Sequence, residues 1–398
     1  MLIGQQVTVL GAGVAGLAVA RALALRGARV TVLEQADAIR EVGAGLQITP
    51  NGAAVLRALG LGDALAAAGL ASSGVELIDG LSGGRVARLD LGRLRPGQSW
   101  QFVHRADLID LLAEGAREAG VEIRLMQRIE RLEMSGEGPA LVTAQGAELR
   151  PGLVIGADGL QSVARAALNG RVAPFFTRQV AWRAVIPAGQ GAAPVAEVHM
   201  GPGRHLVSYP MRGGTLRNIV AVEERMAWVE EGWAQRDDDM EVRLAFAGFS
   251  PRVRGWLDQI GDCWLWGLFR HPVARVWGQV APGAPGRGVA LLGDAAHPTL
   301  PFLAQGANMA LEDAWVLAAM LDAEPDLATA LARYQAARAP RTTRIVAAAN
   351  ANARNYHLRG PLRGVAHLGL GAVSRLAPGR LLGRYDWIHG VDVTEGSR

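Results

Sequence analysis

The sequence predicts an α/β fold with a mainly parallel sheet, an inserted and mostly antiparallel sheet, and a helical C-terminal segment. Apolar runs that are continuous, as in parallel strands, lead into glycine turns and then into helical patterns. Between residues 175 and 270, apolar or alternating stretches are separated by the hairpin signals "GPG" and "RGG". At 398 residues, the chain is also longer than one ordinary core requires.

The composition is that of a compact, enzyme-sized protein. Half of the residues are hydrophobic, and the formal net charge is +4. The arginines are scattered, without a basic run interleaved with aromatics, so we expect no nucleic-acid partner. No apolar stretch reaches the roughly 20 residues of a membrane span. The single cysteine, Cys263, excludes an internal disulfide and is typical of a reducing compartment, so we expect a cytoplasmic protein.

The chain opens with a strand, a glycine turn and a helix. The turn "GAGVAG" carries Gly11, Gly13 and Gly16, and the next predicted strand ends at Glu34. We expect Gly11 to allow the tight turn, Gly13 to let a pyrophosphate approach the backbone, and Gly16 to let helix and strand pack closely. The helix start attracts the anion, and Glu34 accepts from ribose hydroxyls. The pattern predicts a Rossmann-like dinucleotide site but does not separate NAD from FAD; a glycine-rich turn with an incidental acid is the alternative.

Two later stretches repeat this design. "LVIGADGLQSVAR" (153–165) is an apolar strand that ends at Asp158, and "VALLGDAAHPTLPFLAQGAN" (289–308) is a strand that ends at Asp294. Prolines forbid a regular element after Asp294, and helical spacing begins near Gly306. The alternative interpretation is that Asp294 caps a turn and the prolines stiffen a loop. It explains each residue singly but not their order.

With these three motifs in this order, the chain resembles the class A flavoprotein monooxygenases of the p-hydroxybenzoate hydroxylase fold. It is most similar to the branch that hydroxylates salicylate, 3-hydroxybenzoate and 6-hydroxynicotinate. The stretches that carry this resemblance are "GAGLQITPNG" (43–52), "VHRADLIDLL" (103–112), "AWRAVIP" (181–187) and "YDWIHGVDV" (385–393). The pair Leu303 and Ala304 departs from the broad family pattern, in which many members carry glycines.

The resemblance implies FAD as cofactor and NAD(P)H as co-substrate, without a separate nicotinamide domain and without a metal. It places Asp294 on the ribityl chain, Pro301 beside the substrate, and the helix start near Gly306 at the flavin N1–O2 edge. Asp158 and Arg165 match a motif linked to both FAD and NAD(P)H; a turn-capping acid with a salt-bridged arginine is the alternative. The cofactor-binding residues expected are Gly11, Gly13, Val14, Ala15, Gly16, Glu34, Gln35, Gln47, Arg105, Gln127, Asp158, Asp294, Gly306, Ala307 and Asn308.

The inserted sheet carries the expected acid–base residues, His205 and Tyr209. Four residues apart on one strand, they share a face with Val207 between them. That arrangement suits the deprotonation of a phenol by a histidine that titrates near neutral pH; a rim histidine and a core tyrosine are the alternative. The resembled branch has a His and a Tyr at this spacing. We therefore predict catalytic roles for His205, Tyr209, Pro301 and Gln305, and we expect His297 to be structural.

The expected function is FAD-dependent hydroxylation of a phenolic or hydroxypyridine carboxylic acid with NAD(P)H and O2, through a flavin C4a-hydroperoxide. A dehydrogenase or reductase on the same fold and a non-catalytic flavin-binding protein are the alternatives. We expect a monomer or homodimer. The expected division is an FAD-binding domain of residues 1–75, 98–172 and 274–340, a substrate-binding domain of 76–97 and 173–273, and a helical segment of 341–398, irregular toward its end.

Overall fold

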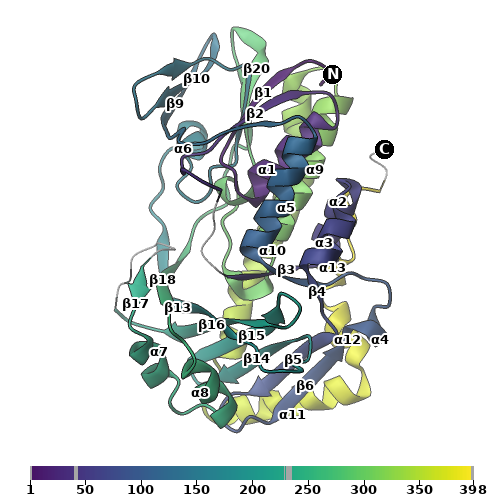
Figure 1. Cartoon of the computed structure of the whole chain (residues 1–398), viewed down its shortest axis with the longest axis vertical. Coiled ribbons are helices and arrows are strands. Elements are labelled where there is room, and N and C mark those ends of the chain that lie inside the picture. Colours follow the sequence, from purple (N-terminus) through teal and green to yellow (C-terminus); the bar gives the residue numbers. More distant parts are fainter. Residues whose placement is uncertain (1, 40–43, 228, 230–234, 396–398) are drawn as a thin grey trace.

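The computed structural model describes residues 2–39, 44–227, 229 and 235–395 and confirms the predicted fold class. Gly43, the first residue of the stretch 43–52, lies outside these residues. One sheet lies at the top of Figure 1 and a larger sheet at the bottom, with long helices running between them. Within the described part of the chain, no helix is both long enough and apolar enough to cross a membrane.

The upper, six-stranded sheet has the order β19-β20-β12-β1-β2-β8, and every neighbouring pair except β19–β20 is parallel. Its strands are β1 (Gln6–Leu10), β2 (Arg29–Leu33), β8 (Glu122–Arg124), β12 (Leu153–Gly156), β19 (Gly278–Ala281) and β20 (Ala284–Leu291). Continuous Val, Ile and Leu runs form the central strands because both faces are covered. The helices beside them are α1 (Val14–Ala24), α5 (Arg105–Glu118), α6 (Val163–Asn169), α9 (Gly306–Ala323) and α10 (Leu327–Tyr356).

The lower, eight-stranded sheet has the order β17-β18-β13-β16-β15-β14-β5-β6 and is antiparallel except for the pair β14–β5. Its strands are β5 (Gly74–Asp79), β6 (Arg85–Asp90), β13 (Phe175–Pro187), β14 (Val195–Gly201), β15 (Arg204–Met211), β16 (Leu216–Glu224), β17 (Arg236–Asp237) and β18 (Cys263–Arg270). The helices α7 (Asp239–Ala245) and α8 (Pro251–Leu257) pack on its outer side (Figure 1).

Smaller elements join the two sheets or extend them. They are β3 (Gly45–Ile48), β4 (Leu70–Ala71), β7 (Gln101–His104), the sheet of β9 (Ile129–Ser135), β10 (Gly138–Thr143) and β11 (Glu148–Leu149), the helices α2 (Pro50–Ala58), α3 (Gly62–Ala68) and α4 (Leu91–Leu94), and the 3₁₀ turns η1 (Gly293–Ala295) and η2 (Pro301–Leu303).

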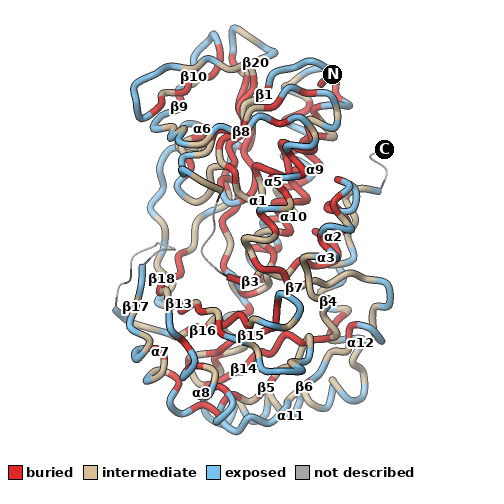
Figure 2. Tube along the Cα trace, in the orientation of Figure 1, coloured by how far each residue is buried: buried red, intermediate tan, exposed pale blue. Residues whose placement is uncertain are grey.

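The C-terminal segment corrects one expectation. The Gly- and Leu-rich stretch predicted to be irregular forms α11 (Gly360–Leu376), followed by α12 (Pro378–Gly383) and α13 (Asp386–His389). Pro361 fits the first turn of α11, where its missing N–H costs nothing, and hydrogen bonds between Ser374 and the backbone of Arg88 hold α11 on β6. Figure 2 shows burial concentrated along α1, α9, α10 and the sheet interiors, whereas α11 at the base contributes no buried residue among those described.

Candidate active site

The three sequence motifs meet at the carboxyl ends of β1, β12 and β20. Gly11 has a φ of +95°, and a Cβ on it would lie 2.7 Å from the Ala157 carbonyl oxygen and 3.3 Å from Asp158 Cα. A Cβ on Gly293 would lie 2.9 Å from Ala15 Cβ. The turn after β1 therefore touches both later turns, at the edge of a parallel sheet where ligands bind.

The glycines of the first turn have the separate roles that their spacing predicts. A Cβ on Gly16 would lie 1.9 Å from the Gly11 carbonyl oxygen, so Gly16 is required by packing. A Cβ on Gly13 would meet nothing within 4 Å. Gly13 instead borders open space at the start of α1, which has no side-chain cap and no acid in its first turn. An uncapped helix start beside open backbone fits a bound pyrophosphate.

Glu34 follows β2 and is fixed by the turn that it faces. Its Oε2 accepts from the Ala12 N–H at 2.7 Å, and its Oε1 accepts from the Ala36 N–H at 2.9 Å. The backbone N–H of Gln127 donates to the Glu34 carbonyl at 2.7 Å, while the neighbouring Gln35 is exposed. The half-buried carboxylate thus lies beside the glycine turn, and each oxygen keeps a lone pair that can accept a hydrogen bond from a ribose hydroxyl.

Asp158 and Arg165 act on the protein itself in this structure. Asp158 accepts from Ser162 Oγ at 2.5 Å and from the Val163 N–H at 2.8 Å, and so caps α6. Arg165 donates to the carbonyls of Ala295 at 3.2 Å and Ala296 at 3.4 Å, and to Pro272. Arg165 thus connects the turn after β12 to the turn after β20. These partners are carbonyl oxygens, whereas the alternative interpretation expected a salt bridge.

Asp294 lies in η1, just after β20; the residue is exposed at the surface, but protein atoms crowd around its carboxyl. Burial raises the pKa of its carboxyl, and the charges of His297, Arg105 and His271 oppose that rise. This electrostatic effect means that Arg105, the first residue of α5, lies close to Asp294. The resemblance assigns both residues to FAD, and that assignment stays a prediction.

A buried charge cluster holds the Asp294 turn on α9. Asp313 accepts from the Gly293 N–H at 3.1 Å and from Arg338 Nε at 2.7 Å, and it also pairs with His297 Nε2. All these side chains are at most 1% exposed. Charges outweigh burial and keep the pKa of Asp313 below its usual value. The expectation that His297 is structural agrees with this contact, although nothing in the sequence indicated Asp313.

A second network fixes the first turn of α9. Asn308 Oδ1 accepts from the Thr49 N–H at 2.9 Å, and Asn308 Nδ2 donates to the Gln47 carbonyl at 2.9 Å. Gln305 Nε2 donates to Thr49 Oγ1 at 3.0 Å, and its Oε1 accepts from Asn51 Nδ2 at 3.1 Å. Both ends of the Gln305 amide are thus occupied within the protein. α9 has no side-chain cap, so its N–H groups at Gly306 and Ala307 remain available for negative charge.

The loop after Asp294 packs on the inner face of the lower sheet. Pro301 is exposed, whereas Phe302 is buried against Ala181, Val222, Trp266, Leu268 and Leu300. The Phe302 ring lies 5.7 Å from the imidazole of His205, which is 2% exposed. The structure therefore brings the Pro301 loop close to His205 through Phe302, and the catalytic roles of Pro301 and His205 stay predictions.

Tyr209 lies on the same sheet face as His205. In the register with β16, His205, Val207 and Tyr209 pair with Val222, Val220 and Asn218. The Tyr209 ring stacks on Phe102 at 4.9 Å, and a Cβ on Gly45 would lie 2.8 Å from its hydroxyl oxygen. Burial raises the pKa of Tyr209 far above its usual range, against the opposing charge of Arg183.

Arg183 belongs to this face but was not predicted as a site residue. It pairs with Val220 in the sheet, and its guanidinium carbon lies 4.5 Å from the Trp266 ring centroid. A single Arg within a strand gives no sequence signal of its own. The register shows it, because Val220 also pairs with Val207, which lies between His205 and Tyr209.

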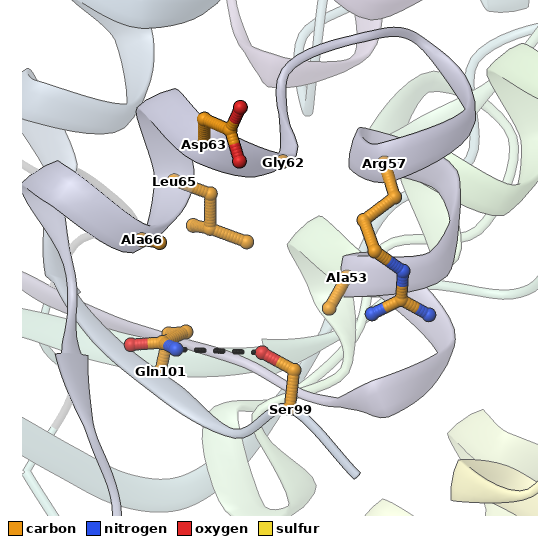
Figure 3. Close-up of a pocket in the computed structure, with 8 residues that line it drawn as sticks. All are labelled: Ala53, Arg57, Gly62, Asp63, Leu65, Ala66, Ser99 and Gln101. Atoms are coloured by element: carbon orange, nitrogen blue, oxygen red, sulfur yellow. Dashed lines mark hydrogen bonds between the residues drawn. The ribbon is translucent and has the colours of Figure 1, made fainter. Parts of the chain in front are cut away.

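A separate cavity of about 230 Å³ lies between α2, α3 and the start of β7 (Figure 3). It is lined by Ala53, Arg57, Gly62, Asp63, Leu65, Ala66, Ser99 and Gln101. None of the predicted site residues lines it, and Figure 3 shows Gln101 hydrogen-bonded to Ser99 at 3.4 Å. We assign it no part in the site.

Together, the parallel sheet, the glycine turn, Glu34 and the uncapped helices define a dinucleotide-binding protein. The family model described as "FAD binding domain" matches residues 5–246 and 269–349. The chain is 37% identical to a 3-amino-4-hydroxybenzoate 2-monooxygenase of Streptomyces cremeus over 361 residues, which cover 89% of this chain and 88% of the relative. It is 36% identical over 399 residues to a 3-hydroxybenzoate 6-hydroxylase of Polaromonas naphthalenivorans, covering 97% of this chain and 96% of the relative.

Among solved structures, the R204Q HpxO of Klebsiella pneumoniae complexed with FAD superposes with a TM-score of 0.81 and 26% identity, covering 96% of this chain and 98% of that chain. The chain belongs to this FAD-binding family of flavoprotein monooxygenases. The predicted resemblance and FAD as cofactor are confirmed.

Proposed function

We propose that the chain hydroxylates a phenolic or hydroxypyridine carboxylic acid with NAD(P)H and O2. The observation that carries this proposal is the placing of His205, Tyr209 and Arg183 on one sheet face, beside the loop that follows Asp294. A base, a hydroxyl donor and a cation match the three polar features of an ionising phenolic acid. The hydroxybenzoate relatives support this substrate class.

The residues present fit FAD. We assign the pyrophosphate to Gly13 and the start of α1, the adenosine ribose to Glu34, and the ribityl chain to Asp294 beside Arg105. Bound FAD would supply the redox chemistry, taking electrons from NAD(P)H and passing oxygen to the substrate. The N–H groups at the start of α9 would stabilise negative charge on the reduced ring.

His205 acts as the base in this scheme, but its acid–base behaviour differs from the sequence expectation. Burial, and then the neighbouring His357, hold the pKa of His205 well below its ordinary value. The expectation that it titrates near neutral pH is therefore wrong. The imidazole is neutral at physiological pH, so a nitrogen is ready to accept the phenol proton without prior deprotonation.

Tyr209 and Arg183 bind and orient the acid. Because burial raises the pKa of Tyr209, its hydroxyl keeps its proton and donates to a substrate oxygen. Arg183, stacked on Trp266, presents a planar cation for the carboxylate. We assign Pro301 to the substrate side of the loop, where the adjacent Phe302 packs on the sheet face, whereas Gln305 supports α9 through Thr49 and Asn51.

A substrate screen tests this function. NADH and NADPH oxidation, with product masses, should be measured with salicylate, 3-hydroxybenzoate and 6-hydroxynicotinate, using plain phenol as the control that lacks a carboxylate. We expect at least one acid to accelerate oxidation and to gain one oxygen atom. Equal flavin reduction with and without every aromatic would instead support a dehydrogenase or reductase. Flavin without any NAD(P)H oxidation would support a non-catalytic flavin protein.

A further inference from the structure

A continuous chain of hydrogen bonds leads from His205 to the protein surface. His205 Nδ1 lies 2.7 Å from His357 Nε2, and His357 Nδ1 lies 3.0 Å from Glu224 Oε1. His205 is 2% exposed and His357 is 5% exposed, whereas the Glu224 side chain is 40% exposed. The chain therefore crosses from a buried sheet face to solvent in three side chains.

The hydrogen-bond chain is built from segments that are distant in sequence. Glu224 ends β16, and His357 directly follows α10, 133 residues later. The turn between β14 and β15 joins them: the Gly203 N–H donates to the His357 carbonyl at 3.2 Å, and the Glu224 N–H donates to the Gly203 carbonyl at 2.9 Å. A Cβ on Gly203 would lie 2.3 Å from Arg359 Nη2, so this glycine makes room for Arg359.

The charges around the outer end keep Glu224 ionised. Burial raises the pKa of its carboxyl, but hydrogen bonds from Arg359 and His357 outweigh burial and lower it. Arg359 Nη2 lies 2.7 Å from Glu224 Oε2. Burial lowers the pKa of His357; Glu224 opposes this, and Arg359 and Arg204 add to it. Both histidines are therefore neutral at rest.

The inner end faces mainly aromatic groups. The ring centroid of Tyr356 lies 5.1 Å from that of His205, and the ring of Phe302 lies 5.7 Å away. Burial raises the pKa of Tyr356 far above its usual value, so its hydroxyl also stays protonated. Among the described neighbours, His357 is the titratable group that bonds to His205.

These contacts determine the histidine tautomers. An ionised carboxylate only accepts, so His357 must donate its Nδ1–H to Glu224. His357 Nε2 then carries no proton and must accept the Nδ1–H of His205. His205 Nε2 consequently carries no proton, and its lone pair is directed away from the hydrogen bond to His357. The outer carboxylate thus selects the base form of the inner histidine.

We propose that His357 and Glu224 are positioning residues that carry the substrate's phenolic proton from His205 to the surface. This proposal rests on the proposed function. As the phenol O–H breaks, His205 Nε2–H forms and the His205 Nδ1 proton moves to His357 Nε2. The His357 Nδ1 proton passes to Glu224, which releases it to water. When the product oxygen is protonated, a proton returns along the reverse path and restores both tautomers.

The first test needs no substrate. Nitrogen-15 NMR of the histidine rings in the FAD-bound protein reports which ring nitrogens carry protons, with assignments from single histidine variants. We expect wild-type His205 to carry its proton on Nδ1. In Glu224→Gln, Arg359 donates to the amide oxygen, which turns the amide NH2 toward His357 Nδ1, so both rings should shift toward the other tautomer. Glu223→Gln is the matched control, because Glu223 lies next in the strand but pairs with Arg204 and Arg225. Wild-type tautomers in Glu224→Gln would overturn the relay.

The second test follows the proton itself. The FAD-bound protein is mixed with 3-hydroxybenzoate in weak buffer that contains a pH indicator, and proton release is timed. Glu224→Gln and His357→Gln should slow release about tenfold or more, and added formate should partly restore the rate in Glu224→Gln. Glu223→Gln should match the wild type. Wild-type release rates in both relay variants would refute the proposal. If 3-hydroxybenzoate does not bind, the substrate assignment fails, and the nitrogen spectra alone decide the relay.

Discussion

Asp313 offers the sharpest test of how the fold holds the site. Its carboxylate joins the Gly293 N–H, Arg338 and His297, and it is fully buried. Breaking a buried charge pair on one side typically costs about 3–5 kcal/mol, because the other charge is left without compensation. Glu312 still pairs with Arg338 at 2.5 Å. We therefore expect Asp313→Asn to lower the free energy of unfolding by about 3 kcal/mol, at the low end of this range.

The measurement is urea unfolding of the FAD-bound protein at pH 7 and at a fixed excess of FAD, since bound ligand adds to apparent stability. The Gly293–His297 turn should also loosen, so the Kd for FAD should rise about tenfold or more, equivalent to about 1.4 kcal/mol. Asp386→Asn is the control: Asp386 also pairs with an arginine, Arg95, but is 51% exposed, so its loss should cost less than about 1 kcal/mol.

The stabilisation that Asp313 contributes should depend on pH in a defined direction. The pKa of Asp313 is lower in the folded protein than its ordinary value of about 3.9. Its stabilisation is therefore fully present above about pH 4 and is lost as pH falls through the lowered pKa. The difference between wild type and Asp313→Asn should shrink in that acid range. An Asp313→Asn protein within about 1 kcal/mol of wild type at pH 7, with unchanged FAD affinity, would refute this reasoning.

Four further substitutions test the site. Gly13→Val should abolish FAD binding while the apoprotein stays folded, because no protein atom lies within 4 Å of the added Cβ; retained FAD affinity would contradict the pyrophosphate assignment. Arg183→Gln should raise KM for the acid substrate about 10- to 100-fold, as for a lost charged hydrogen bond, with little change for an uncharged phenol; equal effects on both would exclude carboxylate binding. His205→Ala should keep FAD and hydroxylate about 10²–10⁴-fold more slowly, recovering at high pH where the phenol ionises unaided, and wild-type rates near neutral pH would make His205 structural. Tyr209→Phe should weaken substrate binding without affecting FAD.

The sequence predicts the parts of this protein whose signals are local. The turn from Gly11 to Gly16 and the face shared by His205 and Tyr209 follow from spacing alone, because strands and glycine turns constrain the chain over a few residues. The helical character of the C-terminal segment was predicted, but its continuation through the Gly- and Leu-rich residues 367–390 was not, because glycines and prolines suggest irregular chain.

Contacts between distant segments could not be predicted. Nothing in the sequence indicates that Glu224 bonds to His357, because the course of α10 brings His357 there. Likewise, only the strand register shows that Arg183 lies on the same sheet face as Tyr209. The lowered pKa of His205 likewise depends on burial, which spacing does not report. The support that the Gln305 amide gives to α9 was not predictable either, because its partners Thr49 and Asn51 lie at the start of α2, 256 and 254 residues earlier in the sequence.

The proposed reaction inserts an oxygen atom from O2 into a phenolic acid. The most direct test reduces the FAD-bound enzyme in the presence of the acid that the screen identifies, mixes it with ¹⁸O2, and measures the product mass after one turnover. We predict one ¹⁸O atom in each hydroxylated product and none when the label is supplied as H2¹⁸O. Reoxidation of the flavin with hydrogen peroxide as the sole oxygen product, for every acid of the screen, would contradict the account.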